Sequence, residues 1–350
     1  MDLEGKVAVE AERVTDWLVA NTPPVVPPLT FELIAGGRSN LTFLVTDAAG
    51  RRLVLRRPPM SHVLATAHDM GREHRIISAL RDSPVPVPDA LGYCDDEAVN
   101  GRPFYVMGVV DGHVLRGARE AEVALDEAGR KAAGADLVDV LVRLHEVDVD
   151  AVGLGELGRR EGYLQRQLRR WYGQFQRSQD QEREAGVHRP AEVVDEVHEL
   201  LSSRVPEQQG VAIVHGDYRL DNTVIGDDGS VRAVLDWELC TLGDPLADVG
   251  TLLIYWADDS PRGRAMQATA LPGFPSRDEL VAAYAARSSL DLSPLPYYVA
   301  FGHWRLACIM EGVYVRYASG AMGDQGGASD MLAQQVIHRA GLARDVLATL

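Results

Sequence analysis

The chain has 350 residues and a formal net charge of −16. Its hydrophobic fraction of 46% and charged fraction of 25% are ordinary values for a soluble globular protein. Its basic residues are almost all arginine, and the two lysines, Lys6 and Lys131, lie outside glycine-rich loops. This excludes the lysine-containing phosphate loop of many nucleotide-binding proteins. The acidic balance also disfavours nucleic acid as a partner, because neutralising phosphates requires basic side chains.

The spacing of the cysteines and the hydropathy of the chain further limit the class of protein to which it can belong. Cys94, Cys240 and Cys308 are far apart and form no C-x-x-C pair, so we expect neither a disulfide framework nor a structural zinc site. Residues 1–14 are charged and lack the apolar core of a signal peptide. No stretch approaches the roughly 18 apolar residues of a membrane span. We therefore expect a cytoplasmic protein without a membrane partner; the sequence leaves the oligomeric state open.

The first part of the chain alternates between helical and strand patterns. After an amphipathic helix comes a proline-rich linker, then three strands, a helix with an apolar stripe, and two further strands. These elements define a predicted N-terminal lobe, residues 1–107, that is mostly antiparallel sheet with one inserted helix. The predicted ranges are 7–20 (helix), 21–29 (linker), 31–34, 41–46 and 53–57 (strands), 69–82 (helix), and 91–94 and 104–110 (strands).

The remainder, residues 108–350, is predicted to be a larger and mainly helical C-terminal lobe. It contains one β island made of three short apolar segments that end in polar residues. The pattern predicts an α+β fold with two lobes, and we expect ligands to bind in the cleft between them. The predicted helices are 120–147, 161–180, 191–204, 277–287 and 297–318, and the strands of the island are 211–214, 223–225 and 231–235.

The densest group of polar residues follows the strands of the island. His215, Asp217 and Asn222 come after the first strand, and Asp236 comes directly after the last. Carboxylate and amide oxygens are ligands that Mg²⁺ accepts while leaving positions for phosphate oxygens. Phosphoryl transfer requires little more than positioning, a metal ion and an acceptor for the proton of the attacking hydroxyl. Taken alone, the pair Asp217 and Asn222 favours the alternative interpretation, in which both residues cap turns.

This pattern has a definite resemblance. D-x-x-x-x-N followed by a strand-end Asp resembles the catalytic loop and metal-binding Asp of the protein-kinase-like superfamily. The HGD form at 215–217 and the segment LDWELCTLGDPLADVG at 235–250 resemble the aminoglycoside phosphotransferase and choline kinase branch. They are most similar to the kinase-like domains related to those attached to some acyl-CoA dehydrogenases. The resemblance covers roughly residues 30–320 and implies a protein-kinase-like bilobal fold.

The resemblance also implies an activity and a set of roles. It implies transfer of the γ-phosphoryl group of ATP, or alternatively GTP, to a hydroxyl group of a small molecule, with Mg²⁺ as the metal. Asp217 would accept or orient the proton of the substrate hydroxyl, and Asn222 and Asp236 would hold the metal. Asp248 would brace the catalytic loop by accepting backbone hydrogen bonds, and His215 would orient that loop.

A kinase of this type also needs a nucleotide-binding part upstream. A turn with two glycines between the first two strands would cover the nucleotide, and its polar side chains would donate to phosphate oxygens. On the third strand, alternation places Val54 and Arg56 on one face, where Val54 would floor the adenine pocket and Arg56 would reach the phosphates. Met107 and Val109 resemble the segment whose backbone binds the adenine edge. The turn residues are Gly36, Gly37, Ser39 and Asn40.

Arg56 stands where other branches of the family commonly have lysine. Glu73 lies on the apolar stripe of the following helix with Ile76, Ile77 and Leu80. A carboxylate on a buried face needs a partner, so we expect an ion pair between Arg56 and Glu73. Alternatively, Glu73 lies at the edge of the stripe and is solvated.

The segment 159–177 suggests what the acceptor is. It holds six arginines and one acid, interleaved with aromatic residues. We expect Tyr163, Arg166, Arg170 and Trp171 to face an anionic acceptor, such as a hydroxyacyl-CoA-like alcohol, rather than a polycationic aminoglycoside. A solvated basic helix face is the alternative interpretation.

Two other functions stay open at this point. A nucleotide-binding pseudokinase or regulatory module would fit the missing lysine, although it need not retain Asp217, Asn222 and Asp236 together. A metal-dependent hydrolase built on His215 and the aspartates would instead carry a tightly bound transition metal and bind no nucleotide.

Overall fold

The computed structural model describes residues 9–35, 40–59, 69–184, 189–257, 267–318 and 328–350. The chain forms two compact units, each built from several segments. Unit 1 comprises Met1–Leu154, Leu220–Cys240 and Pro272–Phe274, and unit 2 comprises Gly155–Arg219, Thr241–Leu271 and Pro275–Leu350. These units are defined by packing and differ from the predicted lobe boundary at residues 107 and 108, which stays a prediction.

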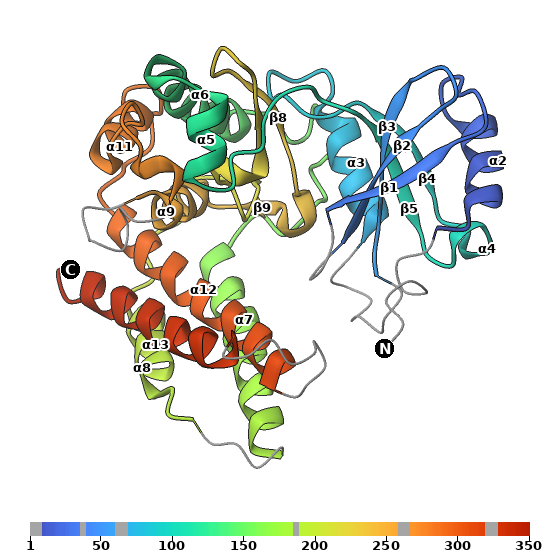
Figure 1. Cartoon of the computed structure of the whole chain (residues 1–350). Coiled ribbons are helices and arrows are strands. Elements are labelled where there is room, and N and C mark those ends of the chain that lie inside the picture. Colours follow the sequence, from blue (N-terminus) through green and yellow to red (C-terminus); the bar gives the residue numbers. More distant parts are fainter. Residues whose placement is uncertain (1–8, 36–39, 60–68, 185–188, 258–266, 319–327) are drawn as a thin grey trace. The chain divides into compact units, whose positions relative to one another are not determined.

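A five-stranded antiparallel sheet forms the first part of unit 1 (Figure 1). Its spatial order is β1-β2-β3-β5-β4, so β3 lies in the centre. All five strands coincide with predicted ones to within two residues at each end. Their bounds are Thr30–Ala35 (β1), Leu41–Thr46 (β2), Arg52–Arg57 (β3), Ala90–Cys94 (β4) and Phe104–Gly108 (β5).

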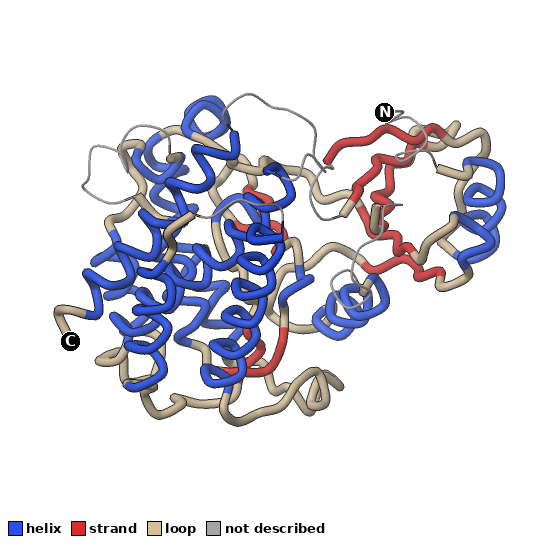
Figure 2. Tube along the Cα trace, turned by 90° about the horizontal axis from the view of Figure 1, so that it is seen from below, coloured by secondary structure: helices blue, strands red, loops and turns tan. Residues whose placement is uncertain are grey.

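Two helices lie on opposite faces of this sheet, α2 (Ala11–Asn21) and α3 (Met70–Leu80) (Figures 1 and 2). Val14 and Leu18 of α2 are buried in one hydrophobic core with Leu53 and Leu55 of β3. Because side chains alternate along a strand, Val54 and Arg56 point to the other face, which α3 covers. The sheet therefore directs a cation toward α3 while its apolar residues pack on α2.

Unit 1 also contains two helices where one was predicted over 120–147. They are α5 (Ala118–Ala124) and α6 (Glu127–His145). The break has a local cause, because the Asp126 side chain accepts a hydrogen bond from Gly129 N at 2.7 Å and caps α6. The other elements of unit 1 are α4 (Glu97–Asn100), η1 (Leu220–Asn222), β7 (Thr223–Ile225), β8 (Val231–Val234) and η2 (Trp237–Leu239).

Unit 2 is mainly helical, and α12 forms its centre, with fifteen buried residues along its length. The sequence predicts α7, α8, α11 and α12, but not α9 or α13. Nine of the ten residues of α9 are buried, so α9 shows no amphipathic period. The bounds are Tyr163–Glu184 (α7), Glu192–Ser203 (α8), Leu246–Tyr255 (α9), Ala268–Ala270 (η3), Arg277–Ala285 (α11), Leu295–Ala318 (α12) and Ala328–Leu347 (α13).

The predicted β island consists of two separate ribbons. In unit 2, β6 (Ala212–Val214) pairs with β9 (Thr241–Gly243), a short strand that the sequence does not predict. In unit 1, β7 pairs with β8. The chain passes from unit 2 to unit 1 between Arg219 and Leu220, so the predicted catalytic loop belongs to both units.

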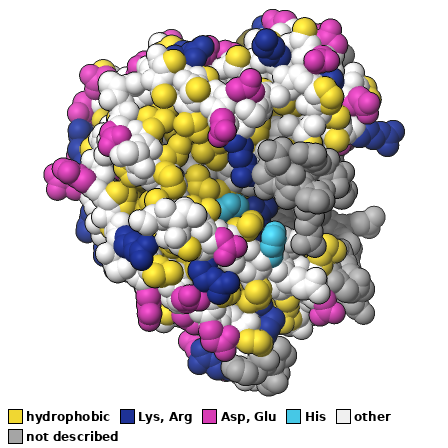
Figure 3. All heavy atoms as spheres, turned by 90° about the vertical axis from the view of Figure 1, so that its left-hand side faces the viewer, with side chains coloured by type: hydrophobic (Ala, Val, Ile, Leu, Met, Phe, Trp, Pro, Cys, Tyr) yellow, Lys and Arg dark blue, Asp and Glu magenta, His cyan; other side chains and the backbone are white. Residues whose placement is uncertain are grey.

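Within the described ranges, no helix has both the length and the apolar composition needed to cross a membrane. Figure 3 shows basic and acidic side chains interspersed on the visible face. The observed helices and antiparallel sheet confirm the predicted α+β class.

Candidate active site

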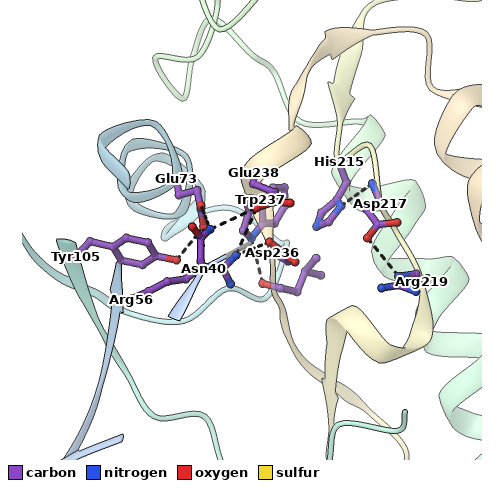
Figure 4. A network of polar contacts seen from close by, with 11 residues as sticks. Asn40, Arg56, Glu73, Tyr105, His215, Asp217, Arg219, Asp236, Trp237 and Glu238 are labelled. Carbon is purple, nitrogen blue, oxygen red and sulfur yellow. Dashed lines mark hydrogen bonds and ion pairs between the residues drawn. The ribbon is translucent and has the colours of Figure 1, made fainter. Parts of the chain in front are cut away.

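Arg56 is the centre of a group of charged residues in unit 1. Its Nη2 donates to Asp236 Oδ1 at 2.5 Å, and its Nε lies 3.3 Å from Glu73 Oε2. The ion pair predicted between Arg56 and Glu73 is therefore present. Glu238 Oε2 lies 4.0 Å from Arg56 Nη2. We refer to Asn40, Arg56, Glu73, Tyr105, Asp236 and Glu238 as the Arg56 cluster (Figure 4).

Glu73 is the most deeply buried acid of this cluster, with 1% of its side chain exposed. It accepts hydrogen bonds from Tyr105 Oη at 3.1 Å and from Asn40 Nδ2 at 3.2 Å. Burial raises the pKa of Glu73 to about 7, and the positive charge of Arg56 opposes this shift. Burial disfavours the charged guanidinium, but the carboxylates of Glu73 and Asp236 raise the pKa of Arg56 above its ordinary value. Arg56 therefore stays protonated.

Asp236 follows β8 and has an unusual backbone conformation. Its φ and ψ are 65° and 64°, a left-handed conformation that is uncommon for a residue other than glycine. Such conformations persist where the surrounding structure holds them, often at functional sites. Oδ1 of Asp236 binds Arg56, whereas Oδ2 has no hydrogen bond to any residue within the described ranges. One carboxylate oxygen is thus available to a ligand.

Asn222 and Asp236 lie at the same end of the β7–β8 hairpin. Thr223 pairs with Val234, and Leu235 N donates to Asn222 O at 2.8 Å. An amide oxygen and a carboxylate are ligands that suit Mg²⁺, so these residues fit the predicted metal. Among the described residues, no group of three or more His, Cys, Asp and Glu side chains is arranged to hold a metal ion.

Asn40 links two acids of the Arg56 cluster. Its Nδ2 donates to Glu73 Oε1 and, at 3.3 Å, to Glu238 Oε2. Its Oδ1 is buried and has no partner in the described part of the chain. Donation from Asn40 to a phosphate oxygen stays a prediction. The other predicted residues of this turn, Gly36, Gly37 and Ser39, lie outside the described residues.

The predicted adenine-binding residues come together on the central strands. Val54 of β3 is paired with Met107 of β5, and each is 8% exposed. Val109 follows β5 and is half-buried. Val54 and Arg56 share a face of β3, which is the arrangement that the sequence predicts for an adenine floor and a phosphate-binding cation.

Unit 2 holds the predicted proton acceptor in the loop 215–219. His215 is fully buried, and its Nδ1 accepts a hydrogen bond from Asp217 N at 3.1 Å. Arg219 Nε lies 3.2 Å from Asp217 Oδ2, and 22% of the Asp217 side chain is exposed. The Arg219 guanidinium also lies 4.5 Å from the ring centre of Tyr255. The loop thus presents Asp217 to solvent with a cation beside it.

The first turn of α9 fixes the backbone of this loop. Asp248 is fully buried, its Oδ2 accepts from His215 N at 2.6 Å, and its Oδ1 accepts from Gly216 N at 2.8 Å. Gly216 has a φ of 85°, which favours glycine at this position. On the other side, Arg305 Nη2 of α12 donates to Gly216 O at 2.5 Å.

Sequence reasoning missed three residues that hold the loop and its surroundings. Arg219 lies inside the recognised motif, and Arg305 lies in a mostly apolar stretch of α12, a pattern that signals a buried polar role. Asp244 is fully buried and accepts from Tyr298 Oη at 2.7 Å and Gln209 N at 2.9 Å.

The predicted acceptor-binding residues on α7 differ in how deeply they are buried. Tyr163 and Trp171 are 2% and 5% exposed and therefore belong to the packing of unit 2. Arg170 is exposed, and its guanidinium lies 4.8 Å from the ring centre of Trp171. Arg166 donates to the carbonyl oxygen of Arg159 at 2.6 Å. Binding of an acceptor by these residues stays a prediction.

Comparisons with known proteins show what the chain is similar to. The model of the phosphotransferase enzyme family matches residues 30–280, more than half of the chain. Acyl-CoA dehydrogenase family member 10 of Mus musculus is 34% identical over 307 residues, which are 85% of this chain and 27% of that relative. The chain therefore spans about a quarter of the length of this curated relative.

Solved structures give the fold. A candidate aminoglycoside phosphotransferase from Ralstonia eutropha JMP134 is 28% identical with a TM-score of 0.79, covering 98% of this chain and 99% of that one. Amicoumacin kinase, solved with AMP-PNP, Ca²⁺ and Ami, is 16% identical with a TM-score of 0.60, covering 98% and 96%. The chain has the protein-kinase-like fold of these phosphotransferases, as the sequence predicts.

Proposed function

The chain belongs to the phosphotransferase enzyme family, and we propose that it transfers the γ-phosphoryl group of ATP to a hydroxyl group of a small molecule, with Mg²⁺. The observation that carries this proposal is the position of Arg56, bound by Glu73 and by the strand-end Asp236. A phosphotransferase needs such a fixed cation for the nucleotide phosphates. The AMP-PNP bound to amicoumacin kinase supports ATP as the donor, and a cytoplasmic location would supply it.

The roles of the residues follow from their chemistry. Asp217 takes the proton of the acceptor hydroxyl as that oxygen attacks phosphorus, and the bond to the leaving ADP oxygen breaks. Asn222 and the available Oδ2 of Asp236 would hold Mg²⁺, which would neutralise phosphate charge. His215 and Asp248 keep the backbone before Asp217 in place through their hydrogen bonds.

Arg56 replaces the lysine common in other branches of the family. A guanidinium is planar and offers several donors in fixed directions, so Arg56 is able to bind Glu73 and a phosphate oxygen together. Binding of nucleotide would exchange the Asp236 contact of Arg56 for a phosphate contact and free that carboxylate for the metal. The proposed site therefore changes partners on nucleotide binding.

We propose that the acceptor is an anionic alcohol, such as a hydroxyacyl-CoA-like compound, rather than an aminoglycoside. The similarity to an acyl-CoA dehydrogenase family member supports this class. The exposed arginines of the segment 159–177 also support it, because they would repel a polycation. These are Arg159, Arg160, Arg169, Arg170 and Arg177.

The proposal is tested first with nucleotide and then with acceptors. Mg·ATP and Mg·GTP at millimolar concentration should raise the melting temperature by mass action, and a panel of alcohols should identify the acceptor by ADP release. Asp217→Ala should bind Mg·ATP as the wild type does and lose turnover. Absence of a thermal shift with both nucleotides would contradict the proposal, and phosphorylation of aminoglycosides alone would contradict the anionic acceptor.

A second candidate function is a nucleotide-binding pseudokinase or regulatory module. The contact of Asp236 Oδ1 with Arg56 favours it, because a predicted metal ligand is already paired. One measurement distinguishes the two functions. A pseudokinase would show the thermal shift with Mg·ATP, but no ADP release that depends on Asp217.

A further inference from the structure

Arg305 is a buried cation in the centre of unit 2. It lies on α12, is 4% exposed, and is surrounded in sequence by the fully buried Trp304 and Cys308. Removing a charge from water is costly unless the protein compensates for it. A buried arginine beside apolar residues therefore requires an explanation from its contacts.

The contacts of Arg305 lead to the backbone rather than to an acid. Its Nη2 donates to Gly216 O at 2.5 Å, and within the described part of the chain its guanidinium forms no salt bridge. Its Nε is buried and has no hydrogen-bond partner there. The positive charge is thus directed at one carbonyl group, that of the residue before Asp217.

The peptide group between Gly216 and Asp217 is consequently fixed at both ends. Arg305 binds its carbonyl oxygen, and His215 Nδ1 accepts from its N–H at 3.1 Å. The preceding peptide group is held separately, because Asp248 Oδ1 accepts from Gly216 N. Orientation of a peptide plane determines the direction in which the next Cα–Cβ bond points, and here that bond carries the Asp217 carboxylate (Figure 4).

Asp248 and Arg305 bring opposite charges to the same loop. A buried carboxylate receives the N–H groups of His215 and Gly216, and a buried guanidinium gives a hydrogen bond to Gly216 O. Both charges act on Tyr163, whose phenol lies near them: burial raises its pKa most, Arg305 lowers it and Asp248 raises it. The two charges thus hold the loop from α12 and α9.

We propose that Arg305 is a positioning residue for Asp217. It fixes the Gly216–Asp217 peptide so that the carboxylate points toward the acceptor hydroxyl. This inference rests on the proposed function, in which Asp217 takes the hydroxyl proton. Removing Arg305 leaves Gly216 O buried without its donor, which lowers stability, so the test separates a loss of stability from a loss of positioning.

Three substitutions test the proposal. Arg305→Met keeps the volume and removes the hydrogen bond, Arg305→Ala leaves a space, and Arg316→Met is a matched control at an exposed position of the same helix. We expect Arg305→Met to lower kcat for phosphoryl transfer by roughly 100-fold, as a displacement of about 1 Å does. KM for Mg·ATP should stay close to the wild-type value, and the melting temperature should fall by only a few degrees, because one buried hydrogen bond is lost. Arg316→Met should behave as the wild type.

Rescue separates positioning from folding. Guanidinium ion at millimolar concentration should restore part of kcat in Arg305→Ala, where it can occupy the vacated space, but not in Arg305→Met. Unchanged kcat in Arg305→Met would overturn the proposal. A loss of kcat that tracks the loss of folded protein, without rescue, would also overturn it.

A measurement of the backbone keeps this test independent of the proposed function. Amide hydrogen exchange in the peptide containing Asp217 should be faster in Arg305→Met than in the wild type and Arg316→Met. Unchanged exchange would overturn the proposal even if the enzyme is active. If the wild type releases no ADP, the proposed function fails, while faster exchange would still support the fixing of the loop by Arg305.

Discussion

The Arg56 cluster and the loop 215–219 are held in place by different means. In the Arg56 cluster, side chains bind one another: one guanidinium contacts Glu73 and Asp236, and Asn40 and Tyr105 donate to Glu73. In the loop, buried side chains bind backbone groups instead. Asp248 accepts two N–H groups and Arg305 donates to one carbonyl oxygen.

The difference shows what each region can do. The Arg56 cluster has three carboxylates around one guanidinium, and its excess of negative charge suits a site that receives a metal ion and exchanges partners. In the loop, the buried carboxylate of Asp248 and the buried guanidinium of Arg305 bind the same short backbone segment. This suits a site in which the Asp217 carboxylate keeps a fixed position. The following predictions test this division between an adaptable site and a fixed one.

The largest effect should come from removing the central cation of the Arg56 cluster. Arg56→Met leaves Glu73 buried without its charged partner, which should lower the free energy of unfolding by about 3–5 kcal/mol and abolish turnover. Arg56→Lys should retain turnover, because the charge remains. Urea denaturation near pH 8 and ADP release measure both effects.

Two variants control this result. Arg52→Met removes an exposed arginine of the same strand, 50% exposed and paired with Asp111, and should change stability by less than about 1 kcal/mol. In Arg56→Met combined with Glu73→Gln, much of the lost stability should return. If the double variant is no more stable than the single one, Glu73 is not the partner that matters.

Asp248→Ala should disrupt the fixed loop. It leaves the N–H groups of His215 and Gly216 buried without their acceptor, which costs about 1–3 kcal/mol for each. Turnover should fall, whereas the thermal shift with Mg·ATP should stay, since the Arg56 cluster is intact. Asp330→Ala, at an exposed position of α13, is the control. Loss of nucleotide binding together with turnover would argue against two separately held regions.

Sequence patterns predicted the ion pair between Arg56 and Glu73, but not the hydrogen bond that Arg305 donates to the backbone of the loop. Helical spacing placed Glu73 on a buried face, and strand alternation placed Arg56 toward it, so their ion pair followed from two local periods. Arg305 is about ninety residues from the loop in the chain, and no local period connects it to Gly216. Its partner became visible only when α12 was placed in three dimensions.

The same reasoning explains which strands and helices could be predicted from the sequence. Strands with clear alternation were predicted to within two residues, because one face packs on α2. Helix α13 was missed because its buried stripe consists of Val336, Ala340, Ala343 and Leu347, in which two alanines weaken the hydrophobic pattern. Helix α9 was missed because it is buried on nearly every side. Strand β9 has three residues, too few for a period to appear.

The pH dependence of stability should distinguish the two regions as well. Burial raises the pKa of Glu73 from 4.5 to about 7, so between these values the folded protein holds a proton that the unfolded chain releases. The contribution of Glu73 to stability is therefore greatest below pH 4.5 and is lost as the pH rises through 7.

Glu73→Gln should remove this dependence. The free energy of unfolding of the wild type, relative to Glu73→Gln, should fall by about 1–3 kcal/mol between about pH 5 and about pH 8. Denaturant titrations of both proteins at each pH give this difference directly. Parallel curves for the two proteins would mean that Glu73 titrates normally, and the Arg56 cluster would then be less strongly coupled than its burial suggests.

The last prediction concerns the support of the loop by the β6–β9 ribbon. Gly243 of β9 pairs with Ala212 of β6, the strand that leads into His215. An added Cβ at Gly243 would lie 2.1 Å from Tyr163 Cδ2, so Gly243→Ala should cost about 1–3 kcal/mol through overpacking.

Gly341→Ala is the matched substitution, because an added Cβ there meets nothing within 4 Å. In the helix α13 it should stabilise the protein by roughly 0.5–1 kcal/mol. If the packing of Gly243 against Tyr163 helps to fix the loop, Gly243→Ala should also reduce turnover at a temperature where the protein is still folded. Reduced stability with full turnover would instead show that Asp248 and Arg305 hold the loop without help from the ribbon beneath it.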